Sequence, residues 1–566
     1  MDRQLDKNHD GIVFPPKQFY LKAGTLIPAL MFISVCFLLP LIFAASGVLS
    51  TDAGKNGMLH DIFTSPYYRK ITGFTFFQAA ASTFFAVAAG LPGGIILGRY
   101  SFRGKRIIHA FTAIPFVLPS IVVVLGFVLV YGNSGAVNKL LVQTFDLGKP
   151  PLKILYTKWA IILAHGFYNF PLTIRYVSSY VSGMAGDQEE AAALLGAGKI
   201  RQFFSVTLPR IIPSVLSAAS IIFIFCFLSF ALILVLGGGP KTTTLEVEVF
   251  RHARIDIDFA GAAVLGSAST FFTLIVTWLY TRLQRITALQ EHGGASGETR
   301  RIRRTAGSIA LRAYLALIAV FALAPLCAIF INSLVIRTGY TDGSVFGFTA
   351  WRKMFTGANT ILSLKSAANS IITATAASGI AAVLGLALSY NIRHSRIIKT
   401  ELVETLLMMP MGISSILLTL GYLSFKSMFH MDRRWNMLLI ILAHSVIAYP
   451  FVLRGIVTAY RKLPDSVFEA ASLLGAGPLS RFVSVELPLL KKALTASAVF
   501  AFAVSMGEIN ATLMLSEGRF VTIPLAVYRL IGSYNYAGAS VLGVVLIITG
   551  VAAFYTMDTI GETDGT

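Results

Sequence analysis

Charged side chains are scarce in this sequence. Asp, Glu, Lys and Arg make up 13% of its 566 residues, about half of the share that a soluble globular protein carries. So few charges cannot cover a water-exposed surface over a chain of this length. The hydrophobic content of 55% and the mean hydropathy of +0.72 instead indicate a protein that crosses a membrane several times.

Cysteine is also rare. Cys36, Cys226 and Cys327 are the three cysteines, and all lie inside apolar stretches with no Cys-x-x-Cys or Cys/His cluster. This pattern predicts neither a disulfide nor a metal site. Acidic residues number 27 against 47 Lys and Arg, but the basic residues stand in short runs between apolar stretches. The positive-inside rule explains that pattern without nucleic acid as a partner.

Long apolar runs dominate the sequence. A membrane-spanning helix needs about 20 predominantly apolar residues, and helix is expected because lipid cannot satisfy free backbone polar groups. We therefore predict an all-α polytopic membrane protein with about twelve transmembrane helices. The predicted spans are 22–48, 74–98, 107–131, 157–179, 214–237 and 259–281, followed by 308–332, 366–390, 402–425, 436–458, 493–515 and 537–557.

Basic residues predict the side of the membrane that each connection faces. A Gly-rich segment with an arginine cluster, 282–307, is interpreted as a flexible linker between two halves, 1–281 and 308–566. The short loops 99–106 and 391–401 are basic as well. Under the positive-inside rule these three segments are cytoplasmic. Because each half has an even number of spans, both termini are also expected in the cytoplasm.

The two halves are copies of one another. Residues 190–209 read EAAALLGAGKIRQFFSVTLP and residues 469–488 read EAASLLGAGPLSRFVSVELP, with thirteen of the twenty positions identical at an offset of 279 residues. The same offset aligns His165 with His444, which we interpret as interhelical hydrogen-bonding residues rather than ligands. An even number of spans inserts both copies the same way up, so the repeat is parallel.

The repeated segments, 187–209 (the first knob) and 466–488 (the second knob), are polar and do not span. Asp187 and Ser466 are expected helix N-caps, each with a glutamate three positions later, which is capping-box spacing. An Ala- and Leu-rich run continues the helix, and Gly-Ala-Gly ends it because glycine accepts the left-handed conformation. Two matched copies on the cytoplasmic side indicate a docking element rather than incidental loops.

Both knobs contain Glu-Ala-Ala, three residues, Gly and a downstream Leu-Pro. In this signature the chain resembles the membrane subunits of ABC importers, and its duplicated six-span halves resemble their fused, two-in-one type I permeases. The resemblance implies that each knob is a coupling helix docked on one of two cytoplasmic ABC ATPase subunits, which bind ATP and Mg²⁺. It also implies an extracytoplasmic substrate-binding protein and a cell (inner) membrane location. The residues implied for coupling are Glu190, Ala191, Ala192, Gly196 and Ala197 in the first knob, and Glu469, Ala470, Ala471, Gly475 and Ala476 in the second.

The chain itself is expected to be a transport subunit without catalytic residues or cofactor. The string nearest to a phosphate-binding loop, 237–242, has Pro240 between its last glycine and Lys241, which such a loop does not allow. A membrane-embedded enzyme is an alternative, but no nucleophile, metal or paired-carboxylate constellation supports it. A second alternative, an ion-coupled secondary transporter, requires several intramembrane charges, whereas Glu508 is the one acid in the interior of the predicted spans.

An acid within an apolar stretch usually faces a cavity or a partner. Glu508, Asn510 and the repeat equivalent Ser229 are therefore candidates for the translocation pathway, with a polar anchor between helices as the alternative role of Glu508. The loop 236–247 resembles that of fused thiamine permeases, which implies a thiamine-like organic cation as substrate. Fused ferric-iron permeases share the architecture and provide the alternative substrate.

Overall fold

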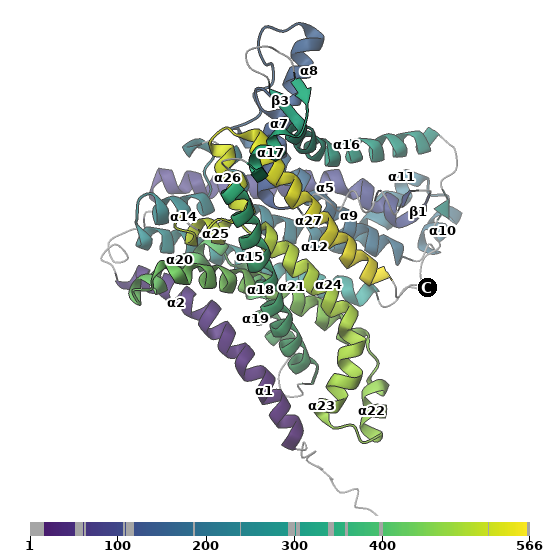
Figure 1. Ribbon diagram of the computed structural model, residues 1–566. Coiled ribbons are helices and arrows are strands. Elements are labelled where there is room, and N and C mark those ends of the chain that lie inside the picture. The colour runs from purple at the N-terminus through teal and green to yellow at the C-terminus, as the bar shows by residue number, and fades with distance from the viewer. Residues whose placement is uncertain are drawn as a thin grey trace, which may run out of the picture.

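The computed structural model describes most of the chain, and within the described ranges the protein is almost entirely helical (Figure 1). Residues 292–299 and 302–305 of the predicted linker lie outside the described residues. The described residues are 16–50, 60, 64–102, 104–105, 108, 118–184, 187–237, 239–291, 300–301, 306–337, 344–356, 360–394, 400–518 and 520–562.

Ten segments of the described chain are long and apolar enough to cross a membrane. They correspond to ten of the twelve predicted spans, and they support the predicted all-α membrane fold. The other two predicted spans are helical, but neither is both long enough and apolar enough to be counted among these ten. The span predicted at 157–179 is a single helix of 25 residues with too many polar side chains. The span predicted at 402–425 is divided into two short helices separated by a 3₁₀ turn at Met409–Gly412.

Helices of the first half have counterparts at corresponding places in the second. A helix pair or a long helix opens each half: α1 (Pro16–Ile33) and α2 (Leu39–Ser50), joined by a π-helical turn at Ser34–Leu38, in the first, and α16 (Ala306–Leu334) in the second. The pairs that follow are α5 (Pro66–Arg99) with α18 (Thr360–His394), α7 (Ser120–Tyr131) with α20 (Ser415–Met428), α9 (Lys158–Ser182) with α21 (Asn436–Lys462), α10 (Asp187–Leu194) with α22 (Asp465–Leu473), α11 (Lys199–Gln202) with α23 (Pro478–Arg481), α12 (Leu208–Phe227) with α24 (Leu487–Gly507), α13 (Ala231–Leu236) with α25 (Asn510–Leu515), α14 (Leu245–Arg254) with α26 (Ile523–Gly532), and α15 (Phe259–Glu291) with α27 (Tyr536–Glu562).

The remaining described elements are short. They are α8 (Ala136–Phe145), α17 (Thr349–Thr356), α19 (Thr400–Leu407), 3₁₀ turns at Pro240–Thr242 and Arg433–Trp435, and the strands β1 (Tyr100–Ser101), β2 (Arg300–Arg301), β3 (Val335–Arg337) and β4 (Ser344–Phe346).

The duplication extends to the contacts between helices. A Cβ atom on Gly90 of α5 would lie 2.6 Å from the carbonyl oxygen of Phe170 on α9. A Cβ atom on Gly385 of α18, 295 positions later, would lie 2.7 Å from Val452 on α21. Small residues at a crossing let two helices approach closely within a membrane. Both halves therefore use glycine at the same place to build the same tight helix pair.

The knobs, α1 and the end of α27 lie toward the same end of the helix bundle, at the right and bottom of Figure 1. Strand β2 of the linker pairs in parallel with β1, which directly follows α5. Helix α1 packs on α23 of the second knob. Helix α8 and the antiparallel pair β3–β4 project at the top of the view, away from the knobs.

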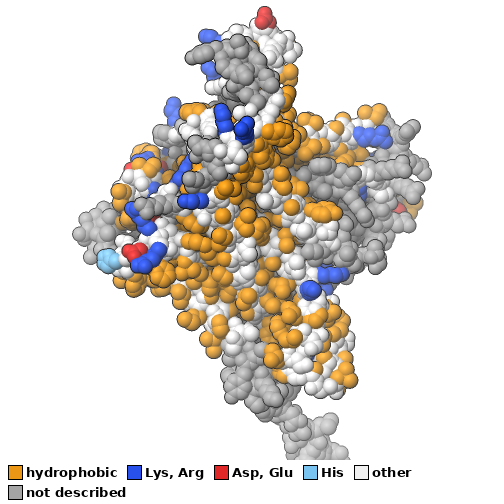
Figure 2. All heavy atoms as spheres, viewed as in Figure 1, with side chains coloured by type: hydrophobic (Ala, Val, Ile, Leu, Met, Phe, Trp, Pro, Cys, Tyr) orange, Lys and Arg blue, Asp and Glu red, His pale blue; other side chains and the backbone are white. Residues whose placement is uncertain are grey.

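The outer surface suits a lipid environment. Figure 2 shows hydrophobic side chains across the middle of one face, with Lys and Arg side chains gathered nearer its margins. Large apolar side chains stand well exposed on spanning helices, among them Met31, Phe84 and Val383. Exposure of this kind over whole helices is the distribution expected where lipid, rather than water, surrounds the protein.

Candidate coupling and translocation sites

Each knob is a helix, a tight turn and a second short helix that continues into a span. In the first knob α10 is followed by α11, a π-helical turn at Phe203–Thr207 and then α12. In the second knob α22 is followed by α23, a π-helical turn at Phe482–Glu486 and then α24. The helix predicted at the start of each knob is thus confirmed in both copies, and the second helix of each knob is continuous with the following span.

The glycine predicted to end the first helix of each knob does so through a left-handed backbone. Gly196 has a φ of +82° and Gly475 a φ of +79°. The amide of Gly196 donates to the carbonyl of Ala193 (2.9 Å), and the amide of Ala197 donates to that of Ala192 (3.0 Å). Equivalent bonds occur in the second knob. This paired pattern is the Schellman motif, which a left-handed glycine makes favourable.

The expected capping box at the start of these helices is wrong for the second knob. Helix α22 begins at Asp465 rather than after Ser466, and its N-cap residue is Pro464, which makes no side-chain capping bond. Proline has a fixed φ that suits the start of a helix, so α22 begins directly after Pro464 and Ser466 lies inside its first turn. In the first knob, the residues before Asp187 and the Asp187 side chain lie outside the described residues.

Both knobs present apolar side chains at their tips. Leu194 and Leu195 are 89% and 88% exposed, and their counterparts Leu473 and Leu474 are each 88% exposed. The predicted coupling residues surround them. Glu190, Ala191, Gly196, Glu469, Ala470 and Gly475 are exposed, Ala192, Ala197 and Ala476 are partly buried, and Ala471 is buried. Leucine pairs held this far out of the protein are characteristic of a surface that another protein covers.

The predicted pathway residues Ser229 and Glu508 both fall at breaks in spanning helices. The helix α12 ends at Phe227 and the chain resumes as α13 at Ala231, and α24 likewise ends at Gly507 before α25 begins at Asn510. Discontinuous helices within the membrane expose backbone polar groups and commonly form transport sites. The sequence placed these residues in continuous spans, so the breaks are a finding of the structure.

Glu508 caps the helix that follows it. Its Oε1 accepts hydrogen bonds from the backbone amides of Asn510 (2.8 Å) and Ala511 (3.2 Å). The Asn510 side chain donates to Ser415 Oγ at 3.0 Å, at the start of α20. Glu508 and Asn510 remain partly exposed although apolar helices surround them. Glu508 therefore anchors the second break through backbone hydrogen bonds, and the residue is partly exposed.

Histidine holds the second break in place. His444 Nδ1 lies 2.8 Å from Ser505 Oγ on α24, and its Nε2 lies 3.2 Å from Thr512 Oγ1 on α25. One side chain thus bridges both sides of the break. In the first half His165 Nδ1 lies 3.4 Å from Ser82 Oγ on α5. The predicted interhelical hydrogen-bonding role is confirmed for both histidines.

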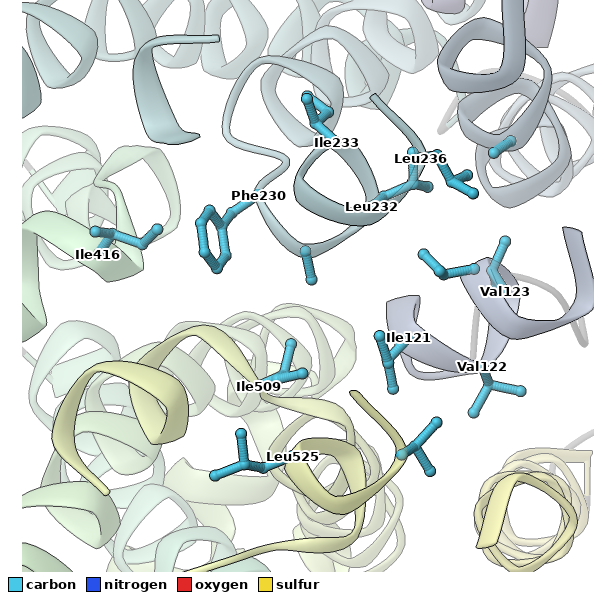
Figure 3. Close-up of a cluster of buried hydrophobic side chains, with 14 of the residues drawn as sticks. Ile121, Val122, Val123, Phe230, Leu232, Ile233, Leu236, Ile416, Ile509 and Leu525 are labelled. Atoms are coloured by element: carbon cyan, nitrogen blue, oxygen red, sulfur yellow. The ribbon is translucent and has the colours of Figure 1, made fainter. Parts of the chain in front are cut away.

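Apolar side chains from both halves meet beside the breaks (Figure 3). Phe230 and Ile509 occupy equivalent positions in the two breaks, and Ile121 and Ile416 occupy equivalent positions in the first turns of α7 and α20. All four are at most 2% exposed. Helix α7 packs on α26 and α27, and α20 packs on α14 and α15. The halves are therefore interlocked around an apolar junction.

Comparison with known proteins places these features in one family. Residues 90–288 and 377–561 match the family described as binding-protein-dependent transport system inner membrane component. The chain belongs to this family. The two matched regions each contain one knob and one broken helix, so the duplicated architecture is the duplicated family domain. The protein is accordingly a permease subunit of a binding-protein-dependent ABC importer and not itself an enzyme, which favours the importer over the secondary transporter.

Several relatives match nearly the whole chain. The thiamine transport system permease protein ThiP of Brucella abortus (strain 2308) is 26% identical over 96% of this chain and 97% of its own length. ThiP of Salmonella typhimurium is 26% identical over 93% of this chain and 94% of its own length. A probable sulfate transport system permease protein, cysT of Prototheca wickerhamii, is 30% identical but covers 38% of this chain.

Sequence reasoning missed Glu246 as a structural residue of this permease. Its side chain is 1% exposed and accepts hydrogen bonds from Ser269 Oγ (2.7 Å) in the first half and from Ser414 Oγ in the second. Ser414 in turn caps α20 by accepting from the amides of Ile416 and Leu417. The residue lies in the loop that resembles that of thiamine permeases, but nothing in the residues around it indicates that one of its partners lies in the other half.

Replacing Glu246 by alanine is expected to loosen the contact between the halves. The change leaves two buried serine hydroxyls without their acceptor, which costs about 1–3 kcal/mol each in buried sites. A lower melting temperature of the purified permease in detergent checks this expectation. Asp432→Ala provides the control, since Asp432 and its ion-pair partner Arg434 are both exposed, and exposed pairs contribute little. An unchanged melting temperature for Glu246→Ala would contradict the bridging role.

Proposed function

We propose that this permease carries a thiamine-like organic cation through the junction between its halves, and that each knob docks one cytoplasmic ATPase subunit. In this account an extracytoplasmic binding protein delivers the cation. ATP and Mg²⁺ are bound by the ATPase subunits alone. The single observation that carries the coupling part is the pair of equivalent knobs, each with a leucine pair exposed at its tip.

The knobs suit a docking role for mechanical reasons. The Schellman turn fixes the angle between the two helices of a knob. The second helix runs without interruption into α12 or α24, so a displacement of the knob moves the following span. Both of those spans end at the breaks beside Ser229 and Glu508. A displacement of either knob therefore moves the span that leads to the apolar junction.

Three observations support an organic cation as the substrate. The relatives that match the chain over nearly its full length are named thiamine permeases. Glu508 is a partly exposed acid at the second break. The junction beside it contains aromatic and aliphatic side chains, including Phe230. A carboxylate next to apolar surface is suited to a cation that carries aromatic rings, and less suited to ferric iron, which favours several oxygen ligands.

Transport by the reconstituted complex tests this proposal. The permease, its ATPase and its binding protein are placed in liposomes, and uptake of radiolabelled thiamine is measured with and without ATP. We expect ATP-dependent thiamine uptake that excess unlabelled ferric iron does not reduce. Uptake of iron but not thiamine would overturn the substrate assignment and leave the coupling role of the knobs untouched.

Replacing Glu508 by glutamine should reduce thiamine transport while the ATPase remains bound. Glutamine keeps an oxygen that can accept from the amides of Asn510 and Ala511, so the change removes the charge and retains the cap. Loss of one charge–cation contact is expected to lower transport about tenfold, as for hydrogen bonds to charged groups. If Glu508→Gln transports normally and Glu508→Ala only destabilises the protein, the residue is an anchor alone.

Cysteine labelling tests the proposed orientation, with knobs and both termini in the cytoplasm. In a variant without native cysteines, Ser480→Cys lies on the second knob and Gly148→Cys lies in the exposed segment after α8 at the opposite end. An impermeant maleimide added to whole cells should label Gly148→Cys and not Ser480→Cys. The reverse result would invert the topology.

A further inference from the structure

We infer that three exposed side chains at the end of the bundle opposite the knobs, Tyr156, Ile257 and Tyr534 (the outer anchors), hold the extracytoplasmic binding protein on this permease. The docking face of that protein is acidic. In the orientation proposed above, this end of the bundle (the outer end) faces away from the cytoplasm. The inference rests on the proposed delivery of the substrate by a binding protein, and it adds which residues receive that protein.

Left-handed backbone is distributed unequally between the two ends of the protein. At the knob end, the left-handed positions among the described residues are glycines, Gly104, Gly196 and Gly475. At the outer end, six described residues with side chains adopt this conformation. Glycine adopts it without steric cost, whereas a residue with a Cβ, and above all a β-branched residue, is disfavoured there. The outer end therefore carries side chains where glycine would be more stable. The six are Asp146, Tyr156, Ile257, His430, Glu517 and Tyr534.

Each outer anchor lies two residues before a helix that runs back toward the knobs. The residue after Tyr156 is the N-cap residue of α9, and a polar residue likewise separates Ile257 from α15 and Tyr534 from α27. An apolar residue just before an N-cap often packs against the fourth residue of the helix. The three anchors are instead 59%, 71% and 77% exposed, in chain order. Packing within the chain therefore does not account for these side chains.

The same turn occurs in both halves of the repeat. Ile257 and Tyr534 are equivalent residues, 277 positions apart. The side chain that follows each of them, Asp258 or Asn535, accepts through Oδ1 from the amide three residues further on, at 2.9 Å and 3.0 Å. Strained backbone is concentrated at functional sites. Its presence in both copies, each time with a large exposed side chain, indicates a contact that both halves make.

Charge around the anchors distinguishes between a protein and a free substrate as their partner. The segment 139–158, which leads to Tyr156, contains four lysines and one acid. Arg529 is exposed on α26, five residues before Tyr534. Such basic surroundings repel a free organic cation, so direct capture of the substrate by these tyrosines is disfavoured. They complement an acidic protein surface instead, and tyrosine is enriched at protein interfaces.

Charged pairs around Ile257 favour a protein over lipid as its partner. Asp256 pairs with Arg251 at 3.3 Å, and Asp258 lies 2.9 Å from His252. Ion pairs of this kind belong outside the hydrocarbon layer, where charge is costly. A large apolar side chain exposed there matches the few anchor residues that supply most of the affinity of an interface. The matching family is binding-protein-dependent, and the binding protein is the partner expected at this end.

Two anchors are connected to the junction between the halves. The amide of Tyr156 donates to the carbonyl of Leu236, the last residue of α13, at 3.0 Å. Tyr534 follows α26, which packs on α7. Both α13 and α7 contribute side chains to the apolar junction. A binding protein seated on the anchors is therefore in contact with segments that lead to the proposed pathway.

Glycine at all three anchors separates docking from stability. The variant Tyr156→Gly, Ile257→Gly, Tyr534→Gly removes the side chains and relieves the left-handed backbone. Its melting temperature should equal or exceed that of the wild type. Its affinity for the binding protein, measured on the permease–ATPase complex in lipid nanodiscs, should fall at least about thirtyfold, the effect of losing one dominant interface side chain. Added salt should slow association of the wild type, because opposite charges steer the encounter.

Ile255→Gly provides the matched control. Ile255 is 67% exposed in the same loop as Ile257 but has an ordinary φ of −102°, and its replacement should change the affinity less than about threefold, as for the near-neutral contacts around an anchor. A lower melting temperature or a wild-type affinity of the triple variant would overturn the inference. Lost transport with unchanged binding would also overturn it, since the anchors would then serve the lipid surface. A wild-type complex that binds the binding protein but takes up no thiamine would overturn the substrate assignment alone.

Discussion

Substituting valine for Gly196 and Gly475 together should abolish substrate-stimulated ATP hydrolysis while the permease still inserts into the membrane. Both glycines have positive φ values, +82° and +79°, which cost a residue with a Cβ about 1–2 kcal/mol each and more for a β-branched side chain. No atom lies within 4 Å of the added Cβ at either site. The loss of stimulated ATP hydrolysis must then come from a changed backbone conformation at the turn, which alters the direction of α11 and α23.

The neighbouring glycines provide the control for this experiment. Gly198 and Gly477 have φ values of −64° and −65° and also have no atom within 4 Å of an added Cβ. Valine there adds the same side chain without the forbidden backbone, so coupling should be largely retained. ATP hydrolysis is measured with and without the loaded binding protein. Full stimulation in the Gly196→Val, Gly475→Val variant would show that the turn geometry is irrelevant to coupling.

Serine at all four tip leucines should release the ATPase subunits. Leu194, Leu195, Leu473 and Leu474 are each almost fully exposed, and burying a leucine against a partner is worth about 1.5–3 kcal/mol. Loss of two leucines per knob should weaken ATPase association by at least about a hundredfold, because 1.4 kcal/mol corresponds to a factor of ten. Insertion should be unaffected because these side chains are almost fully exposed and lie outside the spans.

A matched pair of substitutions at the opposite end of the protein controls for lost apolar surface. Leu140 and Phe145 on α8 are 63% and 66% exposed, and α8 projects away from the knobs in Figure 1. Serine at both positions should leave ATPase association intact in a co-purification assay. If the four-leucine variant co-purifies with the ATPase as well as the α8 variant does, the tips are not the docking surface.

The sequence could predict the elements that follow from local rules. Apolar runs of about 20 residues identify spans, and ten of the twelve were found as such helices. The glycine that ends α10 and α22 was predictable because one residue type satisfies a left-handed turn. The doubled signature with its Leu-Pro indicated the family. These features depend on residues close together in the chain.

Features that depend on distant residues could not be predicted in this way. Ser229 and Glu508 were both expected in continuous spans. The first break, residues 228–230, contains neither proline nor glycine to indicate it. The Ser466 cap was expected from spacing alone, but Pro464 starts α22 instead. The bridge from Glu246 to Ser414 joins residues 168 positions apart, so it requires knowledge of how the halves pack.

Photo-cross-linking from the knobs tests the central claim most directly. A photoreactive amino acid is placed at Leu195 or at Leu474, in cells that contain the ATPase, and at Gly148 as the control at the opposite end. We predict covalent adducts with the ATPase from Leu195 and from Leu474, and none from Gly148. Absence of an ATPase adduct from both knobs, with the permease correctly inserted, would contradict the assignment of these segments as the coupling elements.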